Sequence, residues 1–207
     1  MDGFFKDGDP ILTECVYPLN TFEWWSRIYE YKFVADRVGK TDILLDAACG
    51  LGHPFKVFMV NNCKKVYACD INTLTIDSIE QDRHNWFPDK IPYDVDLLNK
   101  IDLKQADIAD LPYDNEMFDK ICCISVLEHT GLQIRENAIK EFYRCLKSGG
   151  KLLLTVDYPD VNLEEMYSII DATGFKYEKN KDLMPFDNAI RSGWHGGITC
   201  YHFELTK

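Results

Sequence analysis

A short apolar run that ends in a turn of small residues constrains the fold of this chain most strongly. Residues 43–52 read Ile-Leu-Leu-Asp-Ala-Ala-Cys-Gly-Leu-Gly, and a second apolar run over residues 66–69 ends at Asp70, 18 residues after Gly52. In a parallel α/β sheet, glycines in the first strand-to-helix turn let the backbone approach a ligand, and an acidic residue that ends the second strand accepts hydrogen bonds from ribose hydroxyls. The order of these features predicts a nucleoside-binding crevice.

The composition limits the number of domains and the classes of partner. A chain of 207 residues, 46% of them hydrophobic, is long enough for one well-buried α/β domain and too short for two full ones, so we expect a single domain over residues 1–207. The net charge of −11 at pH 7 disfavours binding to a phosphate backbone. No apolar stretch approaches the roughly 20 residues of a membrane span, and Met1 to Phe5 does not resemble a signal peptide. We therefore expect a cytoplasmic protein without a nucleic-acid or membrane partner; the oligomeric state stays open.

Eight cysteines raise the question of disulfide bonds or zinc. Disulfide and zinc frameworks are recognised by regular spacing, and the sequence contains no Cys-x-x-Cys pair. Five of the cysteines lie inside apolar, strand-like runs: Cys49, Cys69, Cys122, Cys123 and Cys200. We therefore expect reduced cysteines that pack in the core, and we predict no metal site.

Strand-like runs alternate with helical patterns along the rest of the chain. The patterns predict helices over residues 20–38, after Gly52, near 73–84, over 132–146 and from 162 to 174, and strands over 103–107, 120–126, 151–156 and 198–205. Residues 85–102 show no clear period and indicate an inserted excursion. Alternating strands and helices imply parallel β-α-β units with right-handed crossovers in a three-layer α/β sandwich.

Four segments make residues 40 to 160 resemble the class I S-adenosylmethionine-dependent methyltransferases. The first is an acidic residue followed by small residues at alternating positions, and the second and third are acidic residues that end strands; the fourth runs from Phe118 to His129 and continues to the turn before Lys151. The matching residues of the first three are Asp46, Ala48, Gly50, Gly52, Asp70, Asp107 and Ile108. The resemblance implies a doubly wound, mostly parallel seven-stranded sheet with an antiparallel last strand.

The resemblance also implies a cofactor, S-adenosylmethionine, with S-adenosylhomocysteine as product. Asp70 then accepts both ribose hydroxyls, Asp107 faces the adenine amino group, and the turn from Ala47 to Gly52 lies against the methionine portion. The cofactor-binding residues carried over in this way are Asp46, Ala47, Ala48, Cys49, Gly50, Gly52, Asp70, Ile71, Asp107, Ile108 and Ser125.

Two residues near the turn depart from common patterns. Ala48 stands where the family has a glycine, and a negative φ at Ala48 would accommodate its methyl group. Phe55 stands where a nicotinamide-binding fingerprint needs a small residue, which argues against a dehydrogenase. We interpret His53 as structural or peripheral, and the acidic stretch from Asp107 to Asp119 as mainly a solvated loop apart from Asp107.

The catalytic residues depend on the acceptor. An alcohol needs a base within about 2.6–3.2 Å of its hydroxyl, whereas a neutral amine needs less help. The candidate bases are His129 after the fourth strand, Asp157 at the end of the fifth, and His195 in a glycine-containing loop. Each residue also fits a role without proton transfer: His129 as a cofactor neighbour, Asp157 as a turn residue and His195 as a contact to substrate or solvent. The sequence therefore does not decide which residue is the base.

We expect O-methylation of a small polar metabolite, with a sugar or nucleotide-linked sugar as first candidate. Residues 1–40, which are rich in aromatic side chains, then form a helical cap over the acceptor pocket. Alternatives are a small-molecule N-methyltransferase, a non-catalytic S-adenosylmethionine-binding regulator, a transferase of the polyamine synthase type, and a metal-assisted relative that uses a divalent ion.

Overall fold

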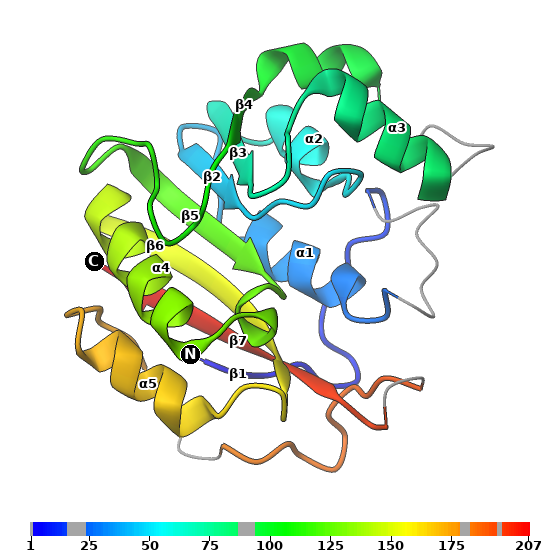
Figure 1. Cartoon of the computed structure of the whole chain (residues 1–207). Coiled ribbons are helices and arrows are strands. Elements are labelled where there is room, and N and C mark those ends of the chain that lie inside the picture. The colour runs from blue at the N-terminus through cyan, green and yellow to red at the C-terminus, as the bar shows by residue number, and fades with distance from the viewer. Residues whose placement is uncertain (1, 16–23, 87–93, 179–182, 194–195) are drawn as a thin grey trace.

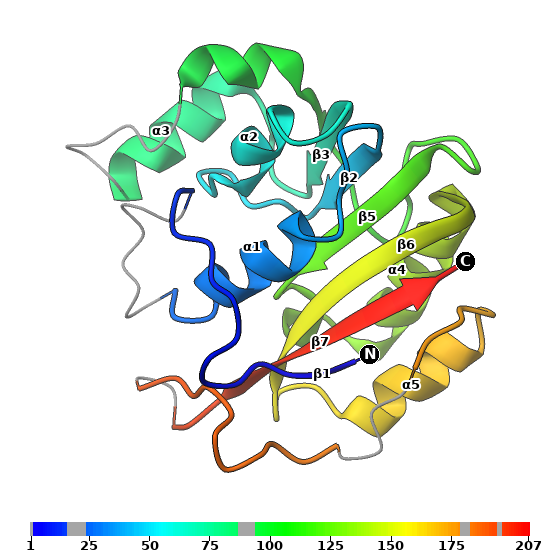
Figure 2. The same cartoon turned by 180° about the vertical axis from the view of Figure 1, so that it is seen from behind.

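A seven-stranded sheet forms the middle layer of the molecule, and helices cover both of its faces (Figures 1 and 2). The computed structural model describes residues 2–15, 24–86, 94–178, 183–193 and 196–207. Within these ranges, no helix combines the length and the apolar character that a bilayer crossing requires.

The elements follow the chain in the predicted alternating order. The strands are β1 (Gly3–Phe4), β2 (Ile43–Ala47), β3 (Lys65–Asp70), β4 (Asp102–Gln105), β5 (Phe118–Ile124), β6 (Leu146–Tyr158) and β7 (Thr199–Thr206). The helices are α1 (Arg27–Ala35), α2 (Phe55–Val60), α3 (Ile76–Trp86), η1 (Val95–Lys100), η2 (Leu127–His129), α4 (Leu132–Cys145) and α5 (Leu163–Asp171), where η marks a 3-10 helix.

The sheet order is β1-β7-β6-β5-β2-β3-β4. The five neighbouring strands β6, β5, β2, β3 and β4, of which β4 forms one edge of the sheet, pair in parallel, and β7 runs antiparallel to both β6 and β1. This confirms the predicted mostly parallel seven-stranded sheet with an antiparallel last strand. The carboxyl ends of β2, β3 and β5 consequently meet at one edge of the sheet.

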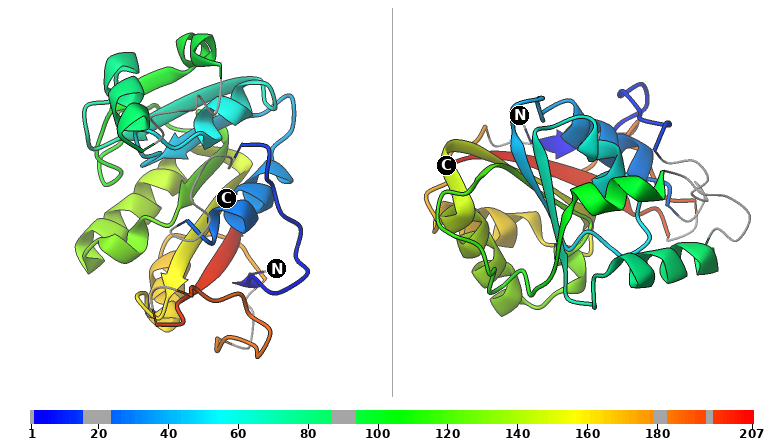
Figure 3. Two further views of the ribbon diagram at one scale, coloured as in Figure 1. Left: turned by 90° about the vertical axis from the view of Figure 1, so that its right-hand side faces the viewer. Right: turned by 90° about the horizontal axis from the view of Figure 1, so that it is seen from above.

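The side-chain alternation of the strands divides the apolar interior into two cores. On β2, Leu45 packs with α4 and α5, whereas its neighbour Leu44 packs with α1 and α2, and both leucines are fully buried. A strand buried on both faces reads as a continuous apolar run because both alternating sets of side chains are inside. Figure 3 shows α4 and α1 on opposite sides of the sheet.

Three local features differ from the predictions. Residues 2–5 do not belong to a helix; β1 instead adds an edge strand beside β7. The Ser148-Gly149-Gly150 segment forms no separate turn after α4, because β6 begins directly at Leu146. The third parallel strand ends at Gln105, so Asp107 lies in the following loop.

Of the predicted excursion over 85–102, residues 95–100 form η1, and residues 87–93 lie outside the described ranges.

A buried carboxylate fixes α1 against the sheet. Glu30 is fully buried, and its oxygens accept hydrogen bonds from Ser125 at the end of β5, from Thr155 on β6 at 2.6 Å and from Cys200 on β7 at 3.5 Å. Its neighbour Arg27 forms an ion pair with it. Burial opposes ionisation of Glu30, but Arg27 and the hydroxyl donors outweigh it and lower the pKa of Glu30. One side chain therefore connects α1 to three strands.

We predict that Glu30→Gln lowers the free energy of unfolding by about 3–5 kcal/mol, because it leaves the Arg27 guanidinium buried without a counter-charge. Urea unfolding followed by circular dichroism measures this loss. The control is Asp36→Asn, which removes an exposed ion pair with Lys32 at the end of the same helix and should cost less than about 1 kcal/mol. Equal losses in the two variants would contradict the role of Glu30.

Candidate functional site

A cavity of about 230 Å³ lies where the carboxyl ends of β2 and β5 face α1. The loop after β2 forms one wall, the loop after β5 forms a second, and aromatic and charged side chains complete it. The lining residues are Trp24, Arg27, Tyr31, Asp46, Ala48, Cys49, Gly50, His53, Phe55, Ile124, Ser125, Val126 and His129. Ligands of open α/β sheets bind at this edge, outside the carboxyl ends of the strands.

The loop after β2 is held in an unusual backbone conformation. Ala48 has a φ of +54° and Gly50 a φ of +63°, so the negative φ that would accommodate the methyl group of Ala48 is not adopted. A hydrogen bond of 2.9 Å from the Cys49 amide to the Cys69 carbonyl ties this loop to the end of β3. At Gly50, a Cβ atom would lie 2.5 Å from a ring carbon of His53. Glycine is therefore required here both by the backbone angle and by the adjacent imidazole.

Lys56, on α2, supports this loop through hydrogen bonds. The side chain is fully buried, and its ammonium group donates hydrogen bonds to the carbonyls of Gly50, Leu51 and His53 at 2.6, 2.7 and 2.8 Å. These bonds use all three donors of the ammonium group. Since α2 begins after Pro54 without a side-chain cap, Lys56 supplies the main polar support that the loop receives from this helix.

Two acidic side chains flank the loop. Asp70, at the end of β3, accepts hydrogen bonds of 3.0 Å from the amides of Gly50 and Asn72. Asp46, near the end of β2, is buried and accepts a hydrogen bond from Cys122 at 3.4 Å. Burial raises the pKa of Asp46 to about 6, while the positive charge of Lys56 opposes this rise. Both predicted carboxylates therefore lie beside the loop, and Asp46 lines the cavity.

The second wall of the cavity carries another strained residue. Ser125 follows β5 with a φ of +47°, and its amide donates to the side-chain oxygen of Thr155 at 3.1 Å. Its hydroxyl donates to Glu30. A positive φ at a non-glycine residue costs free energy and persists only where the surroundings enforce it. Ala48 and Ser125 thus place such strain on two walls of one cavity.

Aromatic side chains from α1 and its preceding turn form the third wall. The Tyr31 hydroxyl and the His53 Nδ1 atom are 2.9 Å apart, and the Trp24 ring meets the His53 ring edge-to-face at 4.6 Å. Burial, together with the positive charges of Arg27 and Lys56, holds the pKa of His53 well below its usual range. His53 is therefore neutral at neutral pH and forms part of the cavity wall, so of the two predicted roles, structural or peripheral, the structural one applies.

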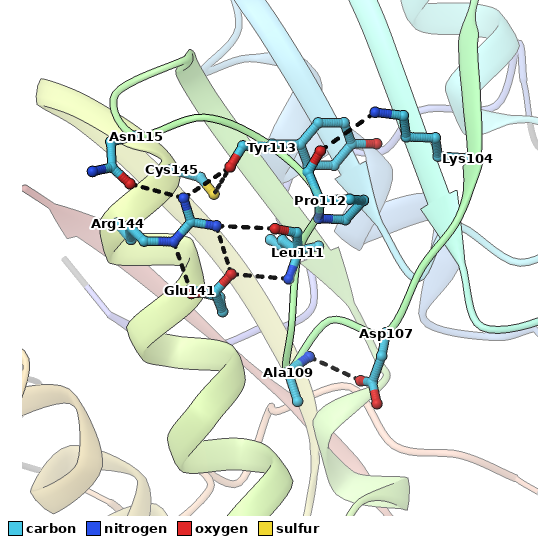
Figure 4. Close-up of polar contacts among 10 residues, drawn as sticks. All are labelled: Lys104, Asp107, Ala109, Leu111, Pro112, Tyr113, Asn115, Glu141, Arg144 and Cys145. Atoms are coloured by element: carbon cyan, nitrogen blue, oxygen red, sulfur yellow. Dashed lines mark hydrogen bonds and ion pairs between the residues drawn. The ribbon is translucent and has the colours of Figure 1, made fainter.

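The residues predicted to contact the adenine ring lie outside the cavity lining. Ile71 follows β3 with two thirds of its surface exposed, and Ile108 is buried in the loop after β4. Asp107 is exposed and accepts a hydrogen bond from the Ala109 amide at 2.9 Å (Figure 4). Ala47 is buried at the end of β2, and the Gly52 amide donates to Asp82 at 2.8 Å.

The loop after Asp107 is mainly exposed, as predicted, but contacts with α4 also hold it in place. Arg144 donates to the carbonyls of Leu111 and Tyr113 at 3.0 and 2.8 Å, and Glu141 accepts from the Leu111 amide at 2.9 Å (Figure 4). Arg144 and Glu141 also form an ion pair with each other. This clamp gives Asp107 and Ile108 a defined position beside the ends of β3 and β4.

The three predicted bases differ in their surroundings. His129 is exposed at the mouth of the cavity. Asp157, near the end of β6, is half-buried, and its Oδ1 atom has no hydrogen-bond partner among the described residues. Burial, and secondly the negative charge of Glu30, raises the pKa of Asp157 to about 7. His195 lies outside the described residues. Across those described ranges, no group of three or more His, Cys, Asp or Glu residues is arranged to hold a metal ion.

The structure thus brings five of the predicted cofactor residues to one cavity: Asp46, Ala48, Cys49, Gly50 and Ser125. Asp70 supports the same loop from the neighbouring strand. Sequence reasoning missed Lys56, Arg27 and Glu30. A charged residue inside an apolar helical pattern, as Lys56 is between Phe55 and Val57, was the available signal.

Comparisons with known proteins agree with this geometry. The sequence model of the family described as "Methyltransferase domain" matches residues 45–154, more than half of the chain. An uncharacterised protein of Methanocaldococcus jannaschii is 30% identical over 130 residues, which cover 61% of this chain and 45% of that protein. The chain spans about half the length of the curated relatives that it matches.

Solved structures share the fold. The N-methyltransferase NodS of Bradyrhizobium japonicum in complex with S-adenosyl-L-homocysteine has a TM-score of 0.60 and 17% identity, with 92% of this chain and 89% of that chain covered. The cyclase SpnF has a TM-score of 0.67 and 16% identity, with 100% of this chain and 87% of that chain covered. Because these two proteins differ in their named chemistry, the shared fold does not itself determine the reaction.

We predict that Lys56→Met weakens binding of S-adenosylhomocysteine at least tenfold, a change of about 1.4 kcal/mol, because three loop carbonyls lose their donor. Isothermal titration calorimetry measures this change. Lys65→Met is the control, since Lys65 also donates to a backbone carbonyl, that of Lys100, but at an exposed position outside the loop. Unchanged affinity in Lys56→Met would show that the loop does not need this support.

Proposed function

The chain belongs to the class I S-adenosylmethionine-dependent methyltransferases, and from this premise we propose that it methylates an oxygen atom of a small polar acceptor. The observation that carries the proposal is the half-buried carboxyl group of Asp157, whose Oδ1 atom has no hydrogen-bond partner among the described residues. Burial raises the pKa of Asp157 to about 7, which suits a general base at neutral pH. Asp157 lies near the carboxyl end of β6, next to the strand β5 whose end forms a wall of the cavity.

The residues of the cavity fit S-adenosylmethionine. The strained loop from Ala48 to Gly50 exposes backbone beside the carboxylates of Asp46 and Asp70, which accept hydrogen bonds from ammonium and hydroxyl groups. We assign Asp70 to the ribose hydroxyls, Asp107 to the adenine amino group, and Asp46 to the methionine ammonium. When bound, S-adenosylmethionine supplies an electrophilic methyl carbon on a sulfonium. The remaining predicted cofactor contacts are Ala47, Cys49, Gly52, Ile71, Ile108 and Ser125.

The protein's own contribution is to position the acceptor and take its proton. Positioning alone can lower a barrier by roughly 7–11 kcal/mol when the reacting atoms are well aligned. Arg27, Trp24 and Tyr31 on the α1 side of the cavity restrict where an acceptor fits. We therefore propose that residues 1–40 contribute to the acceptor pocket, with α1 and its preceding turn as the contacting part.

Small-molecule N-methylation is the second candidate. Glu128 and Asp157 lie near Arg27, which is already paired with Glu30, so the group carries more acid than base and would attract a cationic amine. A non-catalytic binding role is less well supported, because this edge of the sheet has a cavity with charged groups such as Arg27 and Asp46 beside its apolar walls, not a flat apolar patch. A location in the cytoplasm, a small-molecule acceptor and the lack of nucleic-acid and membrane partners belong to the same proposal.

The test is methyl transfer from S-adenosylmethionine to neutral sugars, nucleotide-linked sugars and small amines, read by mass spectrometry of the products. We predict that Asp157→Asn lowers kcat for a hydroxyl acceptor about 100-fold or more, and that the wild-type rate rises with pH through about 7 as Asp157 loses its proton. Asp160→Asn, an exposed carboxyl in the same loop, is the matched control.

Two results would contradict this assignment. A loss of similar size in His129→Gln or His195→Gln, with Asp157→Asn nearly normal, would transfer the base to that histidine. Methylation of amines alone, with all three variants largely active, would establish the N-methyltransferase alternative.

A further inference from the structure

Glu128 is a buried carboxyl group without a hydrogen-bond partner among the described residues. Only 8% of its surface is exposed, and neither Oε1 nor Oε2 is bonded. It lies in η2, which contacts β6, and the nearby Asp157 on β6 has an unbonded Oδ1 atom. Three buried carboxyl oxygens in one place are costly unless a proton or a ligand satisfies them.

The surrounding charges do not neutralise these two carboxyls. Arg27 is the cation that faces both of them, and it forms an ion pair with Glu30. Further ionisable groups near the pair are Glu30 on α1, Cys123 on β5, Asp160 after β6 and Cys200 on β7. On α4, Arg135 donates to the backbone carbonyl of Glu128 at 3.5 Å and forms an ion pair with Glu165. Two carboxylates that share a buried site cannot both ionise easily, so one of them keeps its proton.

We infer that Glu128 and Asp157 act as one unit, a carboxyl pair in which Glu128 keeps its proton and Asp157 receives the proton of the acceptor hydroxyl. The inference rests on the proposed function and adds Glu128 to it as a positioning residue for Asp157. The pKa values of both carboxyls are raised. Burial, and secondly the charge of Asp157, raises the pKa of Glu128 to about 8, and burial raises that of Asp157 to about 7.

The proton transfer balances as follows. The acceptor O–H bond breaks and its proton goes to the Asp157 carboxylate, while the oxygen forms a bond to the methyl carbon. The carbon–sulfur bond breaks and its electron pair stays on sulfur, so the positive charge of the sulfonium and the negative charge of the carboxylate disappear together. Asp157 is half-buried, which leaves a path for the proton to reach water.

The pair also indicates the class of acceptor. A carboxylate beside a carboxylic acid offers a hydrogen-bond acceptor and a donor at the same place, which complements a neutral molecule with adjacent hydroxyls. An anionic group would be repelled by the carboxylate, and a phosphate is therefore disfavoured close to the methylated oxygen. We assign the acceptor to the neutral polyols, such as the hydroxyl face of a sugar.

The first test needs no acceptor: carbon-13 NMR titration of the side-chain carboxyls in the whole protein, labelled at Glu Cδ and Asp Cγ. In the wild type, Glu128 should titrate near pH 8 and Asp157 near pH 7. In Asp157→Asn, the midpoint of Glu128 should fall by about one unit, the coupling expected of carboxyls that share a site. Glu116→Gln, an exposed glutamate before β5, is the control and should leave both midpoints in place.

A second measurement uses stability. Because the folded-state pKa of Glu128 is raised above its ordinary value of 4.5, the cost of burying Glu128 is absent at low pH and grows as the pH rises through about 8. The free energy of unfolding of Glu128→Gln relative to wild type should therefore increase from pH 5 to pH 8.5, whereas that of Glu116→Gln should not.

The third measurement is the pH profile with a hydroxyl acceptor. The rising limb of kcat in Glu128→Gln should stay near pH 7, because Glu128 is protonated and uncharged while Asp157 ionises. A fall of the wild-type kcat above about pH 8, where Glu128 loses its proton, should be absent from Glu128→Gln. Midpoints of Glu128 and Asp157 near 4, or a Glu128 midpoint that does not move in Asp157→Asn, would overturn the pair. A coupled pair in a protein that methylates no hydroxyl would refute the proton-receiving role and the proposed function, while the pair itself would stand.

Discussion

The buried carboxylate of Glu30 holds the N-terminal helix to the end of the sheet where the cavity forms. Through Ser125, Thr155 and Cys200 it reaches the ends of β5, β6 and β7, and through its ion pair it places Arg27 in the cavity wall. Such a charge is retained only with partners on every side. The positive φ of Ser125 is one consequence, because its hydroxyl and amide are both committed to this network.

The wall formed by the loop after β2 is also held by a buried charged side chain, in this case the cation of Lys56. Lys56 satisfies three carbonyls of the loop after β2, and Asp70 satisfies its Gly50 amide, so the strained backbone is fixed before any ligand arrives. A preorganised loop loses little conformational entropy when it binds. Close to the ends of β5 and β6, Glu128 and Asp157 carry buried carboxyl oxygens that have no hydrogen-bond partner among the described residues.

Local patterns in the sequence were enough to predict most of the sheet and much of the cavity. The run from Ile43 to Gly52 specifies a strand and its turn through neighbouring residues alone, and Asp70 follows from the end of the next strand. Contacts between distant residues could not be predicted in this way: Glu30 and Thr155 are 125 positions apart, so no local pattern pairs them. The same limit concealed the clamp of Arg144 on the loop after Asp107 and the wall position of His53.

Calorimetric titration of S-adenosylhomocysteine into the wild type and Asp70→Asn tests the central claim that this loop is the cofactor site. The account predicts micromolar binding by the wild type and binding about 100-fold weaker in the variant, since two hydrogen bonds to a charged group contribute roughly 1.5–3 kcal/mol each. Asp77→Asn, an exposed carboxyl at the start of α3, should bind normally. Absence of binding in the wild type, or equal affinity in Asp70→Asn, would contradict the account.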